Sequence, residues 1–547
     1  MFAGATLLLG WRLYENKTKL IPAAGGSYAE GIVGRPRYVN PLYAPASDVD
    51  RDLTELIFSG LMRYGPTGEI EPDLAEKVDI AADGKTYTFT LRTNLVWHDG
   101  IKLTADDVIF TIEAIQNPDY DSPLRLNWQG VTAEKVDDRT IRFTLNNPYA
   151  PFLENTTVGI APEHVWGGID PSSVALAEGM LKPVGAGPYQ FARLSKTKDG
   201  RIQSYTLRAA PRANDPKTYL NEITIKFFDS ELDAIAALNR REVEGLGAIS
   251  AQNVERLRSR QLATHRLKMP RYFTIFFNQT QSKILADRAV REALARSVDA
   301  NGIVREVLGG LGETVWGPIP PGLPGAGVDP NRYPYTPEEA TKLLDGAGWQ
   351  DKDGDGTREK TLGPSSQLGT GATASSTPLA LTLHVPDNDE LRRVAERIGN
   401  TWKAIGVQLN IRVLPSFDLQ QDVIRPRKYE MVLFGEILGV QPDPFSFWHS
   451  SQKKNPGLNL ALYDNRAADK LLEEARQTLD GEARRAKYEE FSKLVIEDIP
   501  ALFLYSPTYL YPVSNRIKGI SAQLVTVPSK RFVHVEEWYI NTKRVRK

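Results

Sequence analysis

Several segments of the chain alternate apolar and polar residues with the period of two that a half-buried strand requires. Residues 86–92, 140–145 and 222–228 follow this pattern, with threonine or charged residues between the apolar ones. Residues 272–278 instead form a continuous apolar run broken only at Thr274 and closed by an asparagine, as is typical of a strand buried on both faces. The pattern therefore predicts both half-buried and fully buried strands.

Other segments space their apolar residues three and four positions apart, which predicts amphipathic helices. Residues 52–62, 107–115 and 289–308 have this spacing. Thr104 and Asp107 stand at the start of the second segment and resemble a capping box, with aspartate in place of glutamate. We therefore expect that helix to begin directly after Thr104.

Residues 379–434 combine the two periods in a regular order. A strand at 379–385 is followed by a helix at 391–405, a strand at 407–413 and a third strand at 431–434. A strand, a helix and a strand in this order predict a right-handed parallel crossover. The fold class is therefore α/β.

Composition places the chain among soluble globular proteins with more than one lobe. Its 547 residues exceed the size at which a single hydrophobic core keeps growing, and 41% of them are apolar and 25% charged. The net charge of -1 provides no field that would attract nucleic acid or anionic lipid. The chain has no cysteine, which excludes disulfides, thiolate metal sites, a cysteine nucleophile and a lipid-bearing cysteine.

The first 25 residues differ from the rest. Residues 2–11 are apolar apart from Thr6, which is roughly half of a membrane span of about 20 residues. No basic residue precedes this run, as one would in a signal peptide. We interpret residues 1–25 as a partial membrane anchor or signal remnant with a linker from residue 12, and Met1 as an internal start. A short terminal helix packed on the domain is the alternative.

Motifs for catalysis or metal binding are sparse. The six histidines form no spaced ligand pair, and the chain has neither a G-x-S-x-G elbow nor a Walker loop. Residues 351–356 resemble the start of an EF-hand loop, but its twelfth position is Leu362 instead of glutamate. We interpret this segment as a surface turn and predict no metal and no cofactor.

Residues 83–111 form the most distinctive segment. A turn at Asp83-Gly84, an alternating strand, a second turn within Trp97–Gly100 and the capped helix follow one another. This order resembles the signature region of the family 5 extracellular solute-binding proteins, the peptide, dipeptide and nickel receptors of ABC importers. The resemblance extends over about residues 28–540.

The resemblance implies a periplasmic-binding-protein-like fold of type II, with two large lobes, a hinge and a third, smaller lobe. The expected boundaries are lobe I at 26–64, 186–268 and 507–547, lobe II at 65–185, and lobe III at 269–506 with a flexible insertion at 363–377. It further implies an extracytoplasmic protein that binds a solute in an interlobe cleft. We expect a monomer, held at the cytoplasmic membrane by the N-terminal segment described above. Hinge closure then presents the solute to the permease subunits, and nucleic acid is not a partner.

We expect the ligand site at the end of the strand at 431–434, because ligands of open α/β sheets gather at the carboxyl ends of strands. In the family this strand end lines the cleft, and peptide receptors place an aspartate there against the ligand's α-ammonium group. The matching position is Gly439 or Val440, so Glu436 and Asp443 are the only acids nearby. Asp443 also fits a turn between two prolines. The other candidate ligand-binding residues are Gly435, Phe445, Trp448, Arg271, Tyr272, Asn278 and Trp316.

The resulting prediction is a receptor for peptides that binds without chemistry. The missing aspartate favours a first alternative, the same fold with an oligosaccharide, a metal chelate or another non-peptide solute. A cell-surface hydrolase and a chaperone without a small ligand are the alternatives from other classes.

Overall fold

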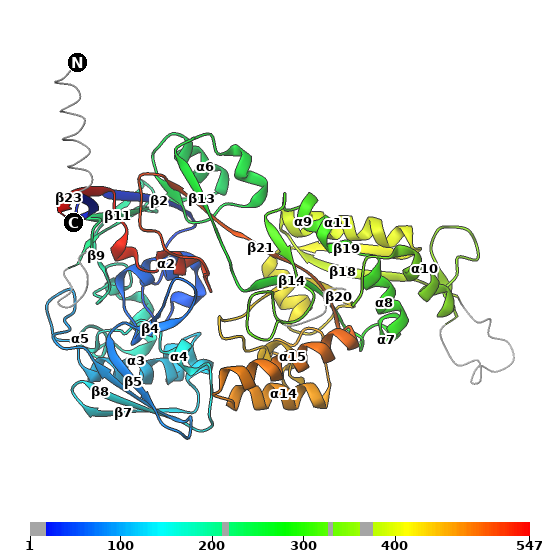
Figure 1. Cartoon of the computed structure of the whole chain (residues 1–547), viewed down its shortest axis with the longest axis horizontal. Coiled ribbons are helices and arrows are strands. Elements are labelled where there is room, and N and C mark those ends of the chain that lie inside the picture. The colour runs from blue at the N-terminus through cyan, green and yellow to red at the C-terminus, as the bar shows by residue number, and fades with distance from the viewer. Residues whose placement is uncertain (1–17, 211–217, 327–331, 362–375, 547) are drawn as a thin grey trace, which may run out of the picture. The chain divides into compact units, whose positions relative to one another are not determined.

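The computed structural model describes residues 18–210, 218–326, 332–361 and 376–546. The chain divides into two compact units (Figure 1). Unit 1 consists of Met1–Pro148, Phe152–Lys268 and Tyr509–Lys547, and unit 2 consists of Tyr149–Pro151 and Met269–Thr508. Residues 1–17 of the predicted anchor and linker (1–25) and nearly all of the predicted flexible insertion (363–377) lie outside the described residues.

The larger sheet of unit 1 has seven strands among the described residues, in the order β13-β22-β12-β2-β11-β10-β9. These strands are β2 (Ser27–Val33), β9 (Tyr189–Lys196), β10 (Ile202–Ala209), β11 (Glu222–Phe228), β12 (Gly245–Leu246), β13 (Leu262–Leu267) and β22 (Tyr509–Ser514). β2 runs parallel to β11 and β12, and β22 runs antiparallel to β13. The predicted alternation at 222–228 is confirmed, because β11 buries every second side chain.

A second, antiparallel sheet of unit 1 contains the other two predicted alternating strands. Its strands are β5 (Ala75–Ile80), β6 (Thr86–Leu91), β8 (Thr140–Leu145) and β7 (Val131–Asp137), in this spatial order, with β3 (Met62–Tyr64) and β4 (Ile70–Pro72) as a separate hairpin. Phe89 lies opposite Ile141, and the Phe89 and Phe143 rings meet edge to face at 5.6 Å. The two segments therefore form strands, as predicted, and their apolar side chains are the buried ones.

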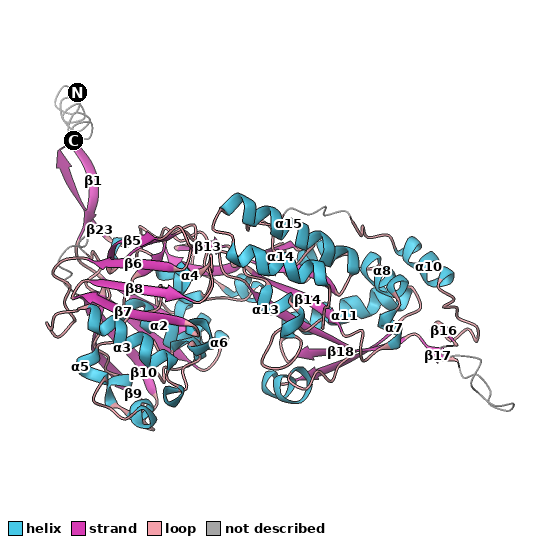
Figure 2. Cartoon of the chain, turned by 90° about the horizontal axis from the view of Figure 1, so that it is seen from below, coloured by secondary structure: helices cyan, strands magenta, loops and turns pink. Residues whose placement is uncertain are grey.

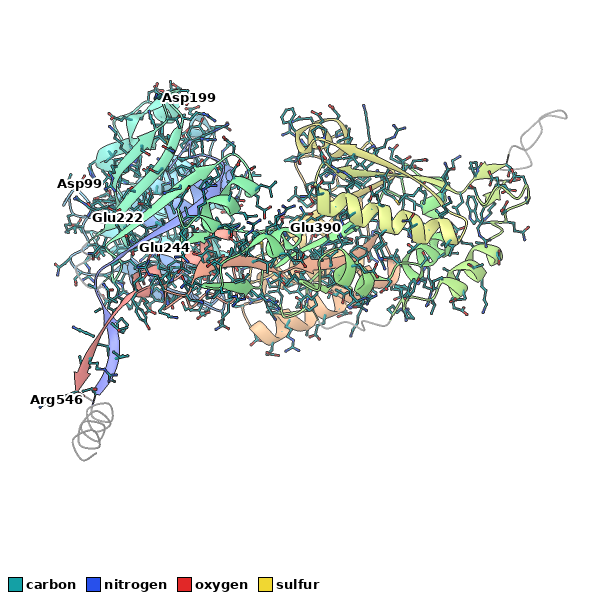
Figure 3. The ribbon with its side chains drawn as sticks, turned by 90° about the horizontal axis from the view of Figure 1, so that it is seen from above. Asp99, Asp199, Glu222, Glu244, Glu390 and Arg546 are labelled. Atoms are coloured by element: carbon teal, nitrogen blue, oxygen red, sulfur yellow. The ribbon has the colours of Figure 1, made fainter. Side chains whose placement is uncertain are left out.

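The helices of unit 1 include the one predicted after Thr104. They are α2 (Asp48–Ile57), α3 (Ala105–Gln116), α4 (Phe152–Asn155), α5 (Glu163–Trp166) and α6 (Glu231–Asn239). The predicted capping box forms, with Asp107 Oδ2 accepting a hydrogen bond of 2.9 Å from the backbone N–H of Thr104. In the preceding turn, Asp99, which is labelled in Figure 3, has its Oδ2 atom 2.8 Å from His164 Nε2, a contact within unit 1 that agrees with a structural role for this segment.

The N-terminal end of the described chain differs from the linker expected there. Thr18–Ala23 forms β1, which pairs antiparallel with β23 (Asn541–Arg546) from the other end of the chain (Figures 2 and 3). This pairing satisfies backbone groups of a segment whose sequence shows no periodicity, so the pattern alone does not reveal it. None of the helices among the described residues is both long and apolar enough to span a membrane.

Unit 2 is built on a six-stranded mixed sheet, as far as the described residues show, in the order β15-β21-β14-β20-β18-β19. Its strands are β14 (Arg271–Phe277), β15 (Gly312–Thr314), β18 (Ala380–Pro386), β19 (Gln408–Leu414), β20 (Met431–Ile437) and β21 (Ala501–Pro507), with β16 (Glu359–Lys360) and β17 (Thr377–Pro378) as a separate pair. β18 runs parallel to both β19 and β20, so the predicted crossover through the helix at 391–405 is confirmed.

The helices of unit 2 cover its sheet. They are α7 (Lys283–Ala286), α8 (Arg288–Arg296), α9 (Ala300–Glu306), α10 (Pro337–Gly346), α11 (Asp389–Ala404), α12 (Ser416–Asp418), α13 (Phe445–Trp448), α14 (Arg466–Gln477) and α15 (Gly481–Asp498). α14 and α15 lie side by side (Figure 2). The helix expected at 289–308 is two helices, because Asp299 caps α9 by accepting a hydrogen bond from the backbone N–H of Gly302.

The two faces of β14 and β20 serve different cores. Ile275, Phe277 and Leu433 point into the main core of unit 2, where α8 and α11 also pack. Tyr272 and Glu436 belong to the opposite face of the sheet, since side chains alternate along each strand. Of the predicted ligand residues on these strands, Tyr272 and Glu436 therefore lie outside the main core, whereas Arg271 and Gly435 belong to the same face as Ile275 and Leu433.

Candidate functional site

The strand register brings Tyr272 and Glu436 together. Tyr272 on β14 lies directly opposite Glu436 on β20, and Phe273 lies opposite Gly435. A Cβ atom on Gly435 would come within 2.8 Å of the Phe273 ring. Gly435 is therefore required by packing against Phe273, and the polar pair beside it is Tyr272 and Glu436.

Glu436 is a buried acid without a counter-charge. Its relative exposure is 2%, and its Oε2 atom accepts a hydrogen bond from the Tyr272 hydroxyl. Oε1 accepts no hydrogen bond from the described residues. Desolvation raises the pKa of Glu436 to about 8, against the opposing effects of the Tyr272 hydroxyl and the Trp448 indole. The raised pKa favours the protonated form, and a side chain that is only 2% exposed is not presented to a ligand's ammonium group.

Trp448 closes this cluster as part of a second, aromatic core. It is fully buried, and its ring lies 6.1 Å from the Phe276 ring and 5.7 Å from the Phe503 ring. Phe503 also contacts the Tyr272 ring, at 5.8 Å between centroids. Tyr272, Glu436 and Trp448 thus lie below the surface of unit 2 and support the strand end.

Asp443 takes part in a different contact. Arg476 on α14 binds it through two nitrogens, with Nε 2.9 Å from Oδ1 and Nη2 2.6 Å from Oδ2. The Tyr149 hydroxyl donates a third hydrogen bond to Oδ2 at 3.2 Å. The Arg476 guanidinium also lies 3.8 Å from the centroid of the Phe445 ring. Asp443 and Phe445 are therefore held together by Arg476, which carries the opposite charge that Asp443 requires.

Of the remaining predicted residues, Arg271 lies at this strand end, directly opposite Ile437. The guanidinium of Arg271 lies 5.4 Å over the Phe273 ring. Asn278 is fully buried and stabilises a turn, with Oδ1 accepting 2.7 Å and 3.2 Å hydrogen bonds from Thr280. Trp316 is half-buried and lines a small cavity together with Phe503.

Beyond the buried cluster, the residues at the strand end that reach the surface are few and mostly apolar. Ile437, the last residue of β20, is 46% exposed, and the following residues Gly439, Val440 and Gln441 are half-buried. Sequence reasoning placed the site at this edge but missed Arg476, which lies 33 residues after Asp443. No local signal links the two positions.

The acidic turn after α10 is also described. Asp351, Asp353 and Glu359 place one carboxylate oxygen each within 4.8 Å of one another, and the first two are exposed. Asp351 accepts hydrogen bonds from the backbone N–H groups of Gly354 and Gly356. These hydrogen bonds close an exposed turn, as the sequence predicts.

The sheets of the two units and the parallel crossover of unit 2 are those of an α/β protein of the type II periplasmic binding-protein class. Residues 69–458 match the family described as bacterial extracellular solute-binding proteins, family 5. The match covers more than half of the chain, and the chain belongs to this family.

Individual relatives cover nearly the whole chain. It is 26% identical over 530 residues to the oligopeptide-binding protein AppA of Bacillus subtilis, which covers 95% of this chain and 92% of the relative. The solved structure of that protein in complex with a nonapeptide superposes with a TM-score of 0.75 at 25% identity, over 95% and 100% of the two chains. The crystal structure of NikZ from Campylobacter jejuni in complex with Ni(L-His) reaches a TM-score of 0.74 at 25% identity, over 94% and 99%.

Proposed function

We propose that the protein is the substrate-binding component of an ABC importer, that it binds without chemistry, and that its solute is a peptide. The observation that carries the proposal is the end-to-end similarity to the oligopeptide-binding protein AppA, in sequence and in fold. Membership of an extracellular binding-protein family supports the extracytoplasmic location. A monomeric state and membrane anchoring through the N-terminus are further parts of this proposal.

The recognition chemistry in unit 2 differs from a simple ammonium–carboxylate pair. Glu436 is buried and its pKa is raised, and Asp443 is bound by Arg476. We therefore propose that the strand end at Ile437–Gln441 binds the peptide through backbone groups and apolar contact. Such contacts suit a receptor that accepts varied side chains, because backbone hydrogen bonds are independent of sequence.

We also propose the division of unit 1 into lobe I and lobe II, with boundaries as expected from the sequence. The seven-stranded sheet lies within the expected lobe I, and the four-stranded sheet lies within residues 65–185. Apart from the short segment Tyr149–Pro151, the chain enters unit 2 after Lys268 and returns to unit 1 at Tyr509. We propose that the hinge lies at these two crossings, near Met269–Asn278 and Leu502–Tyr509. Ligand binding then shifts the population of arrangements of the units.

One observation favours a second candidate, a receptor for a metal chelate. The strand end presents no accessible carboxylate of its own, and the similar protein NikZ was solved with Ni(L-His). A chelate that carries its own ligands would not need an ammonium partner in unit 2.

Thermal unfolding in the presence of defined solutes tests the proposal. A pool of random peptides of three to nine residues should raise the melting temperature by about 2 °C, since a ligand at about 100 times its Kd stabilises by about 2.7 kcal/mol and a chain of this size has a large entropy of unfolding. Ni(L-His) and an oligosaccharide mixture serve as matched alternatives and should leave the melting temperature unchanged. A rise in melting temperature with either of these and none with peptides would contradict peptide binding and identify the protein as a receptor for a non-peptide solute.

A further inference from the structure

Two strands from opposite ends of the chain form a basic ribbon on unit 1. β1 (Thr18–Ala23) and β23 (Asn541–Arg546) pair antiparallel as a two-stranded sheet of their own, which we call the basic ribbon. Figures 2 and 3 show it leading away from the body of unit 1, with Arg546 at its far end. Its two sequences, TKLIPA and NTKRVR, contain four basic residues and no acid. The four are Lys19, Lys543, Arg544 and Arg546.

The ribbon presents apolar side chains beside these cations. All four basic side chains are exposed, and Leu20 is 58% exposed. The strand register places Leu20 directly opposite Arg544 on one face of the ribbon. On the other face, Ile21 lies opposite Lys543. Each face therefore suits a surface that offers both anionic groups and hydrocarbon, as a lipid bilayer does.

The positive charge of the ribbon is local. The whole chain has a net charge of -1, which by itself attracts no anionic surface. Charges are screened over about 8 Å at physiological ionic strength, so a surface in contact with the ribbon senses mainly the cations of the ribbon. Since packed sheets lie only about 10 Å apart, a single sheet is thin enough for the cations on both faces to contribute.

The sequence places an apolar segment close to the ribbon. Residues 2–11, which are apolar apart from Thr6, end seven positions before β1 begins. Seven residues of extended chain span at most about 25 Å, so a bilayer that takes up residues 2–11 is within reach of the ribbon. An apolar segment of roughly half a membrane span is a weak anchor, and stable membrane binding then takes a second signal such as a polybasic patch.

We propose that the basic ribbon docks on the anionic surface of a lipid bilayer and holds unit 1 at the membrane. Lipid phosphate groups accept hydrogen bonds from the basic side chains, and the exposed Leu20 contacts hydrocarbon. An acidic protein would also attract the cations, but it would give no role to the apolar segment beside the ribbon. This docking adds a second membrane contact to the proposed anchoring through the N-terminus, and it rests on that part of the proposed function but not on the solute.

Binding of the full chain to lipid vesicles tests the docking. Vesicles of phosphatidylglycerol and phosphatidylcholine provide an anionic surface, and vesicles of phosphatidylcholine alone provide a neutral one. Each lysine or arginine near an anionic membrane raises the affinity about fivefold, so the four cations should give a preference for anionic vesicles on the order of several hundredfold. The preference should shrink as salt is added, because salt screens the charges.

A double variant removes one cation from each face of the ribbon. Lys543→Gln with Arg546→Gln should weaken binding to the anionic vesicles about 25-fold, and folding should not change because both side chains are exposed. Lys196→Gln with Lys198→Gln is the matched control, since both lysines are exposed and the net charge changes equally. They lie beside Asp199, which Figure 3 places at the opposite end of unit 1 from Arg546. The control should leave the vesicle affinity unchanged.

Two results would overturn the inference. One is equal affinity for the anionic and the neutral vesicles, and the other is an equal loss of affinity in the ribbon variant and the control. Either result would assign the ribbon to an acidic protein partner instead.

Melting temperatures with the peptide pool, measured on the same proteins, separate this inference from the proposed function. The ribbon variant should keep the rise in melting temperature that the unmodified protein shows with peptides. A rise with peptides but no preference for anionic vesicles rejects the docking alone. A preference that depends on the ribbon, without any rise with peptides, rejects the proposed solute alone.

Discussion

Replacing Arg531 with methionine should lower the free energy of unfolding of unit 1 by about 3–5 kcal/mol. Arg531 lies in the 3-10 helix Pro528–Phe532 and is completely buried. It binds Glu30 on β2 through Nε at 3.0 Å and Asp52 on α2 through Nη1 at 2.7 Å. The substitution leaves two carboxyl groups buried without a counter-charge. Even with Arg531 present, desolvation raises the pKa of Asp52 to about 6.

Urea denaturation measures this effect, and Arg516→Met is the matched control. Arg516 pairs with Glu244 at 2.9 Å, but its side chain is 66% exposed, so its loss should cost less than about 1 kcal/mol. A loss below about 1 kcal/mol for Arg531→Met would show that the buried network is not what joins β2, α2 and the C-terminal segment.

Replacing Glu436 with glutamine should change the dependence of stability on pH. The pKa of Glu436 in the folded protein, about 8, lies above its ordinary value of 4.5, so the native state binds more protons than the unfolded chain between these values. The stability that the protonated group contributes is complete below about pH 4.5 and is lost as the pH rises to about 8. Glutamine keeps an acceptor for Tyr272 and cannot ionise.

The variant should therefore equal the unmodified protein at pH 5 and exceed it by about 4 kcal/mol at pH 9. Glu390→Gln is the control, because Glu390 (Figure 3) also accepts a hydrogen bond from a tyrosine, Tyr505, at 2.8 Å but is only half-buried. It should change stability by less than about 1 kcal/mol at both pH values. An advantage of Glu436→Gln that is the same at pH 5 and pH 9 would contradict the burial of an ionisable carboxyl group.

Local periodicity predicts much of the fold but not its interruptions. The strands at 86–92 and 272–278 and the capping box at Thr104 are confirmed, because each is specified by residues close together in the chain. The apolar spacing of 289–308 continues across the break between α8 and α9, so it does not reveal that Asp299 caps a new helix.

The candidate site depends even more on contacts between residues far apart in the chain, which local sequence patterns do not reveal. The sequence identifies Glu436 and Asp443 as the acids near the strand end. The hydrogen bonding of Glu436 and the ion pairing of Asp443, however, depend on residues far away in the chain. Tyr272 is 164 positions from Glu436, and Arg476 approaches Asp443 from α14. The basic ribbon of unit 1 combines β1 with β23 in the same way, and no short motif marks it.

Native mass spectrometry of the protein purified without denaturation tests the central claim, peptide binding, most directly. The released ligands are identified after unfolding. The account predicts a mixture of short peptides with varied sequences, because contacts with the peptide backbone do not select one side chain. A single non-peptide species, such as a metal chelate or an oligosaccharide, would contradict the claim.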